Sequence, residues 1–328
     1  MISKKFLKFE IVKNFFMVIL RDLYMRNDFK CILCGHTGHP TNTKHVPRDR
    51  KDLKIVNCPI CGHRQLFPLL SDEELKEEYN EDKTVRSYTQ NAAISDFEAM
   101  RVKFSEWTKI HADMYWDKLQ ECNYVLNLGS GFGFLEEELN KREGRKFHIE
   151  GDEIGKFRLD NWVGGVVHTV NFMTDSIPQE MIGKYDLVMA LHLLEHLHSP
   201  VEYLRKLKPL LKKSGKLLIE VPNLDCYLCE LSPEYKEFFY LYEHVSYYTI
   251  NTLTMAFDKA GYKVSAAYTK ELYSIENHIN WIRTGKPFTK YNQMFLPDRR
   301  IEFINEEYKQ AIGAKGKGYA LIVEGQLP

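Results

Sequence analysis

Short apolar runs alternate with longer segments whose apolar residues recur every three or four positions, and this pattern occupies residues 121–328. Such alternation predicts strands joined by helices, hence an α/β, doubly wound, mostly parallel sheet with right-handed crossovers. Ligands of these sheets bind at the carboxyl ends of the strands. We expect strands at 124–128, Lys146 to Ile149, Val166 to Thr169, Tyr185 to Ala190, Lys216 to Val221, Lys263 to Ala267 and Tyr319 to Glu324. Helices are expected between most of them, for example from Pro200 to Lys212.

The remaining segments differ in pattern. A capped polar helix is expected from Ser71 to Tyr79, and 3.6-residue spacing resumes from about Ser95 to Gln120. Tyr88, between them, is expected to be a structural aromatic. The predicted organisation is an amphipathic helix (1–30), a zinc ribbon (31–70), a helical connector (71–120) and a cofactor domain (121–328) with a helical insert (273–317). The ribbon and the cofactor domain are expected to have separate cores.

Glycines stand at every second position, Gly129, Gly131 and Gly133, between the first strand and an amphipathic segment. A strand, tight glycine loop and helix make a ligand cradle, because side chains would hold the backbone away from the ligand. A dinucleotide fingerprint would need a small residue at Phe134, so the spacing favours another adenosyl ligand. An acid ending the second strand can accept hydrogen bonds from ribose hydroxyls; Glu153 fits best, with Asp152 beside it.

Four cysteines form two C-x-x-C-G pairs, Cys31 with Cys34 and Cys58 with Cys61. In a cytosolic chain this spacing predicts one tetrahedral, structural zinc ion. Four flanking histidines could substitute as ligands, but four thiolates already complete a closed site, so the histidines are expected at the surface: His36, His39, His45 and His63. Cys226 and Cys229 have no partner pair and are expected to be two buried thiols.

Composition limits the partners. Lys+Arg and Asp+Glu both number 45, so no basic excess argues for nucleic acid, and none is expected. The apolar run near the start is too short to span a bilayer, and we expect a cytoplasmic protein. Residues 1–30 are basic and amphipathic; packing on the same domain or on a partner subunit is favoured over peripheral contact with the inner face of the membrane.

The block from Tyr185 to Asn223, taken with the glycine loop, resembles class I S-adenosylmethionine-dependent methyltransferases. The resemblance implies that the loop holds S-adenosylmethionine and that residues after the third and fourth strands complete its site. One departure is Asn127, where the family usually has an acid; an amide can still form hydrogen bonds. The implied cofactor set is Asn127, Gly129, Ser130, Gly131, Gly133, Asp152, Glu153, Asn171 (preferred over Asp175) and Leu191.

The cluster Tyr242-Glu243-His244 is similar to the sugar-modifying branch of these enzymes, including deoxysugar C-methyltransferases with an N-terminal zinc ribbon. This similarity implies a sugar or surface-glycan acceptor, with His244 as base, Glu243 orienting it and Tyr242 binding the acceptor. As a base, His244 is expected to titrate near working pH. His196, after the fourth strand, is the rival base. The insert before the last strand resembles those of cell-surface polysaccharide methyltransferases.

Several alternatives stay open. The similar C-methyltransferases continue with a large additional carboxy-terminal domain, whereas the sequence here stops soon after its last expected strand, so C-methylation of a keto-deoxysugar is the less favoured expectation. RNA or a quinone-like phenol could be the acceptor. A different class is a zinc-ribbon adaptor with a degenerate methyltransferase domain, for which the basic residues between the cysteine pairs would be the binding face.

Overall fold

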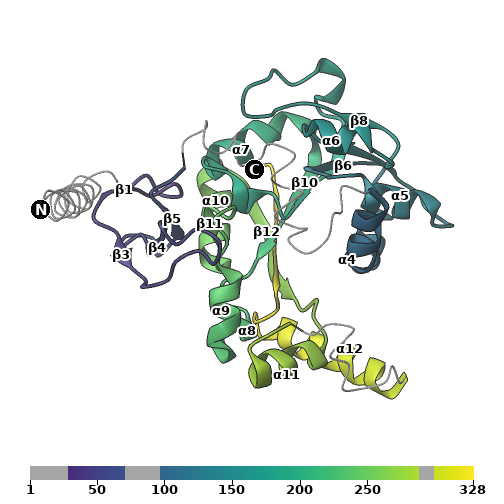
Figure 1. Cartoon of the computed structure of the whole chain (residues 1–328). Coiled ribbons are helices and arrows are strands. Elements are labelled where there is room, and N and C mark those ends of the chain that lie inside the picture. The colour runs from purple at the N-terminus through teal and green to yellow at the C-terminus, as the bar shows by residue number, and fades with distance from the viewer. Residues whose placement is uncertain (1–28, 71–96, 288–298) are drawn as a thin grey trace, which may run out of the picture.

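The computed structural model of this chain describes residues 29–70, 97–287 and 299–328 (Figure 1). The expected amphipathic helix at 1–30, the capped helix from Ser71 to Tyr79, and Tyr88 lie outside these residues. Within the described residues, no helix is long and apolar enough to cross a bilayer.

A seven-stranded sheet forms the larger part of the molecule, in the order β8-β7-β6-β9-β10-β13-β12. The first five of these strands are mutually parallel, and β13 runs antiparallel to both of its neighbours. The predicted doubly wound α/β sheet is therefore confirmed. The strands are β6 Tyr124–Leu128, β7 His148–Asp152, β8 Val167–His168, β9 Tyr185–Leu191, β10 Leu211–Pro222, β12 Lys263–Lys270 and β13 Ala320–Gln326.

Helices surround this sheet, with α4 packed against α5, α7 against α10, and α12 against β12. Their amphipathic spacing places leucines and aromatic rings inward. They are α4 Phe97–Leu119, α5 Phe134–Lys141, α6 Lys156–Asp160, α7 Pro200–Leu207, α8 Tyr227–Leu231, α9 Pro233–Phe239, α10 Ile250–Ala260, α11 Ile275–Thr284 and α12 Arg299–Ala314, with 3-10 turns at η1 Gln179–Met181, η2 Leu194–His196 and η3 Lys208–Leu210.

The expected helix from Pro200 to Lys212 ends early, at Leu207. Pro209 explains the difference, because it cannot donate the backbone hydrogen bond that would continue the helix. The chain passes through η3 directly into β10, which is longer than expected at its amino end.

The cysteine-rich segment forms two small antiparallel sheets. β1 Phe29–Lys30 pairs with β2 Thr37–Gly38. A four-stranded sheet, β11-β5-β4-β3, contains β3 Thr41–Asn42, β4 Lys54–Asn57 and β5 Arg64–Phe67, and its edge strand β11 is Ser246–Tyr247 from the second half of the chain. The cofactor domain thus completes the sheet of the ribbon (Figure 1).

The ribbon and the large sheet share one apolar core. Phe29 and Val56 belong to the same buried cluster as Leu126 and Val188 of the large sheet. We expected the ribbon and the cofactor domain to have separate cores, and this expectation is wrong. Its physical reason is that β11 and the loop before it bring apolar residues of the cofactor domain under the ribbon.

Candidate functional site

The glycine loop joins β6 to α5 at the carboxyl edge of the sheet. Gly129, Gly131 and Gly133 have φ values of 66°, 64° and 77°, which residues with side chains rarely adopt. A Cβ built on Gly131 would meet no atom of the described residues within 4 Å, whereas one on Gly133 would lie 2.6 Å from the backbone nitrogen of Gly164. The loop therefore leaves open space over Gly131, as a cofactor cradle requires.

Ser130 ties this loop to β7. Its Oγ donates to the carbonyl oxygen of Asn127 (2.8 Å) and accepts from the Asp152 amide (2.9 Å). The Ser130 amide donates to the Asp152 carbonyl oxygen over 3.0 Å. Ser130, which we predicted to bind the cofactor, is used here to fix the shape of the loop.

Of the two predicted acids, Glu153 faces the glycine loop. Its Oε2 accepts from the Gly131 amide (2.9 Å), and its Oε1 accepts from the amides of Ile154 (3.0 Å) and Gly155 (2.8 Å). Asp152 turns the other way, accepting from the Val170 amide over 2.9 Å. Burial raises the pKa of Asp152 to about 7. Glu153 as the ribose acceptor stays a prediction.

The other predicted cofactor residues occupy different surroundings. Asn127 is buried and bonded to Glu136 on α5. Asn171 is half-buried after β8, and its Oδ1 accepts from the Met173 amide over 3.0 Å. Leu191 ends β9, paired with Glu220 of β10. Asn171 and Leu191 thus follow strands at the carboxyl edge, whereas the Asn127 side chain has a partner within the protein.

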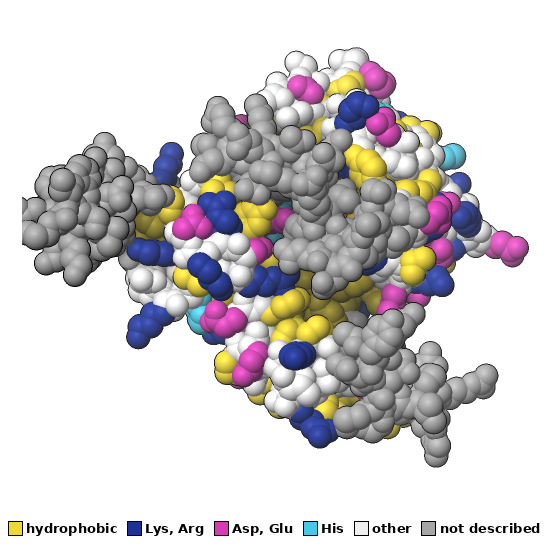
Figure 2. All heavy atoms as spheres, viewed as in Figure 1, with side chains coloured by type: hydrophobic (Ala, Val, Ile, Leu, Met, Phe, Trp, Pro, Cys, Tyr) yellow, Lys and Arg dark blue, Asp and Glu magenta, His cyan; other side chains and the backbone are white. Residues whose placement is uncertain are grey.

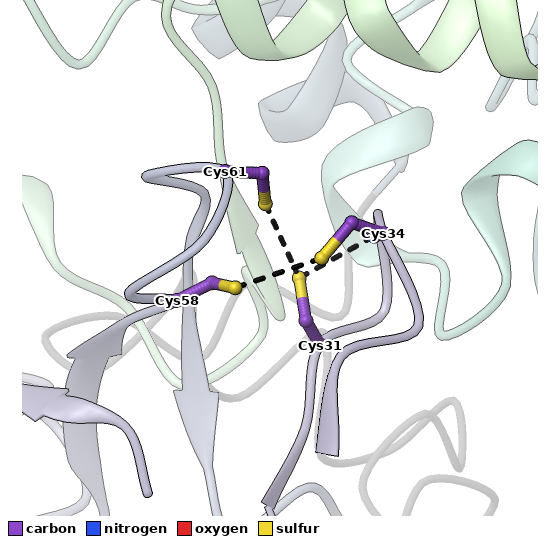
Figure 3. A group of neighbouring side chains, drawn as sticks. All are labelled: Cys31, Cys34, Cys58 and Cys61. Atoms are coloured by element: carbon purple, nitrogen blue, oxygen red, sulfur yellow. Dashed lines mark hydrogen bonds between the residues drawn. The ribbon is translucent and has the colours of Figure 1, made fainter. Parts of the chain in front are cut away.

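The four paired cysteines converge on one point, as Figure 3 shows. The Sγ atoms of Cys31 and Cys61 are 3.6 Å apart, as are those of Cys34 and Cys58. A zinc ion with Zn–S bonds of about 2.3 Å holds its sulfur ligands roughly 3.8 Å apart. All seven cysteines are free thiols, so no disulfide competes. The predicted pairs therefore form a four-cysteine cluster whose spacing suits tetrahedral zinc.

Two flanking histidines depart from the expected surface position. His63 is fully buried, and its Nε2 lies 3.2 Å from Ser246 Oγ on β11. His45 is half-buried, and its Nδ1 lies 2.8 Å from Oε1 of Glu237 on α9. Both histidines face the cofactor domain, because the ribbon packs on it there. Cys226 and Cys229 are buried, as predicted.

The predicted catalytic residues lie where the ribbon meets the sheet domain. The backbone nitrogen of Tyr242 donates to Asp49 Oδ1 of the ribbon over 3.0 Å. His196 Nδ1 bonds to the carbonyl oxygen of Glu243 (2.9 Å), and the rings of His196 and His244 are in edge contact with centroids 4.8 Å apart. The structure thus brings both histidines together, although they are far apart in sequence.

Burial affects His244 and Glu243 in opposite directions. Burial, and next the nearby His196, lowers the pKa of His244 to about 3, so its ring stays neutral at working pH. We expected His244 to titrate near working pH, and the structure differs because the ribbon covers this segment. Burial raises the pKa of Glu243 above its ordinary value.

A second group of ionisable side chains was missed from sequence. His111 of α4 lies 2.8 Å from Glu220 of β10 (Nε2 to Oε1), and His192 Nε2 lies 3.1 Å from the same oxygen. His192 Nδ1 reaches Glu195 Oε1 at 3.3 Å, and Tyr115 donates to the other oxygen of Glu220. Burial alone would lower the pKa of His192, but the nearby carboxylates of Glu195 and Glu220 raise it to about 10.

Aromatic rings surround this His–Glu group. Trp107 meets His192, Tyr273 and Tyr319 edge-on, with centroids 5.8 to 6.3 Å apart. All four residues are partly exposed. Figure 2 shows hydrophobic side chains gathered on this face between the positions of α4 and α8 in Figure 1. The carboxyl edge of the sheet therefore combines an open glycine loop, imidazole and carboxylate groups, and aromatic surface.

This combination defines an adenosyl-binding α/β protein of the methyltransferase class. Residues 101–267 match the sequence profile of a methyltransferase domain family, and the chain belongs to that family. The predicted class of S-adenosylmethionine-dependent methyltransferases is thereby confirmed.

Curated relatives and solved structures are similar over parts of the chain. A tRNA U34 carboxymethyltransferase of Colwellia psychrerythraea is 28% identical over 153 residues, 39% of this chain and 47% of that protein. A ubiquinone biosynthesis O-methyltransferase of Pseudomonas aeruginosa is 29% identical over 102 residues, 30% of this chain and 44% of that protein. The chain thus spans less than half of these relatives. A SAM-dependent methyltransferase structure from Archaeoglobus fulgidus covers 70% of this chain and 99% of its own, with 21% identity and a TM-score of 0.45.

Proposed function

We propose that the protein transfers a methyl group from S-adenosylmethionine to a hydroxyl oxygen of a sugar, either nucleotide-linked or part of a surface glycan. When bound, S-adenosylmethionine supplies a sulfonium methyl group for in-line transfer. The observation that carries the proposal is the open space over Gly131, at the same sheet edge as the imidazole and carboxylate groups. Glu153 would hold the ribose and the loop the amino-acid end.

Between the two histidines, the geometry favours His196 as the base. Its Nδ1 faces the Glu243 carbonyl oxygen, so in the neutral ring Nε2 carries the lone pair. Glu195 Oε1 lies 4.0 Å from Nε2, beyond hydrogen-bond distance. His244, with its lowered pKa, binds a proton too weakly to act as an efficient base. The acceptor oxygen would gain the methyl group in place of its proton, which passes to His196.

The aromatic rings support a cyclic acceptor. The rings of Trp107, Tyr273 and Tyr319 can pack on the C–H faces of a sugar, and polar groups beside them can bond its hydroxyls. A phenol is the second candidate acceptor, because a ubiquinone biosynthesis O-methyltransferase is similar over 102 residues.

Labelled S-adenosylmethionine tests the proposal. The protein is incubated with nucleotide sugars, surface-glycan fragments or catechol-type phenols, and label in each acceptor is measured, with Gly131→Val as the inactive control. We expect label in a sugar acceptor, released by cleavage of a methyl ether. If only phenols were labelled, the acceptor would be a phenol and the sugar proposal would be wrong. If calorimetry detected no binding of S-adenosylmethionine, the zinc-ribbon adaptor would be favoured.

A further inference from the structure

We propose that His111, His192 and Glu220 bind a divalent first-row transition-metal ion, at a site separate from the four cysteines. The ligand atoms of these three residues all lie within 4.8 Å of one another. His111 Nε2 and His192 Nε2 are 2.8 and 3.1 Å from the same atom, Glu220 Oε1. Ligands about 2.1 Å from a metal ion and 90 to 109° apart lie roughly 3.0 to 3.4 Å from one another.

The outer hydrogen bonds orient both imidazoles for this role. His111 Nδ1 bonds to the Trp107 carbonyl oxygen (2.8 Å), and His192 Nδ1 bonds to Glu195 Oε1 (3.3 Å). With the proton on Nδ1, each ring carries its lone pair on Nε2, which faces Glu220. Metal-binding histidines usually donate their other N–H to a carbonyl or a carboxylate, as here. Tyr115 holds the second oxygen of Glu220, so the carboxylate is oriented as well.

The alternative arrangement is a metal-free pair of imidazolium rings between the two carboxylates. In that case His192 Nε2–H should point at Glu220 Oε1. The atoms are 3.1 Å apart, yet His192 Nε2 is buried without a hydrogen bond of acceptable geometry to any described residue. Glu195 and Glu220 are 1% and 0% exposed, so their charges require a cation nearby. A lone pair of His192 directed at a metal ion satisfies both observations.

The ion would keep positions open toward the candidate acceptor site. The His192 side chain is 28% exposed, whereas that of Glu220 is fully buried, so access is from the His192 side, where Trp107 and Tyr319 lie. Three protein ligands with open positions are typical of catalytic metal sites. Two imidazoles and one carboxylate suit Mn²⁺, Fe²⁺, Co²⁺ or Zn²⁺ better than Mg²⁺. The idea that the ion binds an oxygen of the acceptor rests on the proposed function. The binding of the ion to the protein does not.

Manganese is the probe, because its hard character keeps it from displacing zinc from four thiolates. The full chain, with its ribbon zinc retained, is titrated with Mn²⁺ while the electron paramagnetic resonance signal of free Mn²⁺ is followed. We expect one equivalent of Mn²⁺ to bind, with pulsed spectra of the unmodified protein showing coupling to imidazole nitrogen. Glu220→Gln and His192→Gln should weaken binding at least a hundredfold, and Tyr115→Phe about tenfold to a hundredfold.

His148→Gln is the matched control, because His148 is an exposed histidine at the amino end of β7. Zinc content and S-adenosylmethionine affinity verify that each variant is folded. The proposal is overturned if the unmodified protein binds neither Mn²⁺ nor Co²⁺ at millimolar concentration, if bound Mn²⁺ shows no nitrogen coupling, or if folded Glu220→Gln and His192→Gln bind it as tightly as His148→Gln. None of these measurements requires methyl transfer, so failure of the sugar proposal would leave the metal result intact.

Discussion

Asn127 Nδ2 donates a 2.7 Å hydrogen bond to Glu136 Oε1 in the core behind the glycine loop. The two remaining oxygens, Asn127 Oδ1 and Glu136 Oε2, are buried without a hydrogen-bond partner in the described structure. Burial, its largest influence, raises the pKa of Glu136 to about 7. A proton bound to the Glu136 carboxylate would supply the hydrogen-bond donor that these two oxygens lack. An acid at position 127, as the family usually has, would place two carboxylates together, so the amide suits Glu136.

This pair predicts how stability depends on pH. The folded-state pKa of Glu136 is raised, so the protein gains stability below the ordinary pKa of 4.5 and loses it as pH rises through about 7. A shift of this size corresponds to roughly 3 kcal/mol. Gln in place of Glu136 supplies the donor at every pH. We expect Glu136→Gln to be more stable than the unmodified protein at pH 8 and similar to it near pH 4.5, measured by urea unfolding.

Glu138→Gln is the control for this measurement, because Glu138 lies on the same helix but is half-exposed and paired with Arg142. Such surface pairs contribute about 0 to 1 kcal/mol. The interpretation fails if both variants show the same dependence of unfolding free energy on pH as the unmodified protein.

The cofactor cradle is tested by Gly131→Val. Its side chain would project into open space at φ 64°, the space we assign to S-adenosylmethionine, so calorimetry should detect no binding. Gly183 is the matched control: it has the same φ and open surroundings, but it precedes β9 at the opposite edge of the sheet. Gly183→Val should carry similar backbone strain and retain affinity. Unchanged affinity in Gly131→Val would place the cofactor elsewhere.

The four-cysteine cluster is tested by elemental analysis. We expect one zinc ion at this cluster in the unmodified protein, its loss in Cys58→Ser, and its retention in Cys122→Ser, which changes a cysteine outside the cluster. Because β11 pairs with β5, loss of zinc should also accelerate hydrogen exchange of the Leu66 amide, which donates to Val245. Full zinc occupancy in Cys58→Ser would disprove the assignment.

The base assignment predicts unequal effects of the two histidines. His196→Ala should keep S-adenosylmethionine affinity while turnover falls about a hundredfold to ten-thousandfold, the usual loss for a general base. His244→Ala should have the smaller effect, through lost packing on His196. The opposite order would restore His244 as the base, as first expected from sequence. Normal turnover in both variants would mean that positioning alone suffices.

Much of the sheet could be predicted because strands and helices differ in local period. The glycine loop, the acid after the second strand and the cysteine pairs are also local patterns. The His–Glu group could not be found this way. His111 lies in the middle of α4, Glu220 lies in an apolar strand, and nothing in the sequence near Glu220 indicates which residues bind its carboxylate. Only the packing of α4 across the carboxyl edge brings them together. His192 also has an unusual backbone angle, φ 54°, but nothing in the sequence indicates it.

Docking of the ribbon was missed for the same reason. Tyr242 to His244 looked like a catalytic motif, and nothing in the sequence of Ser246 and Tyr247 marks them as an edge strand for residues far upstream. Their pairing with Gln65 and Arg64 depends on the completed large sheet, which presents that loop to the ribbon.

The pairing of β5 with β11 also orders events during protein synthesis. Arg64–Phe67 leaves the ribosome long before Ser246–Tyr247, so the outer edge of β5 has no partner strand while β6 to β10 are being made. An unpaired strand edge is a template for wrong association between chains. Capture of metal by Cys31, Cys34, Cys58 and Cys61 needs none of the later residues, so it can hold the nascent ribbon in shape until its last strand arrives.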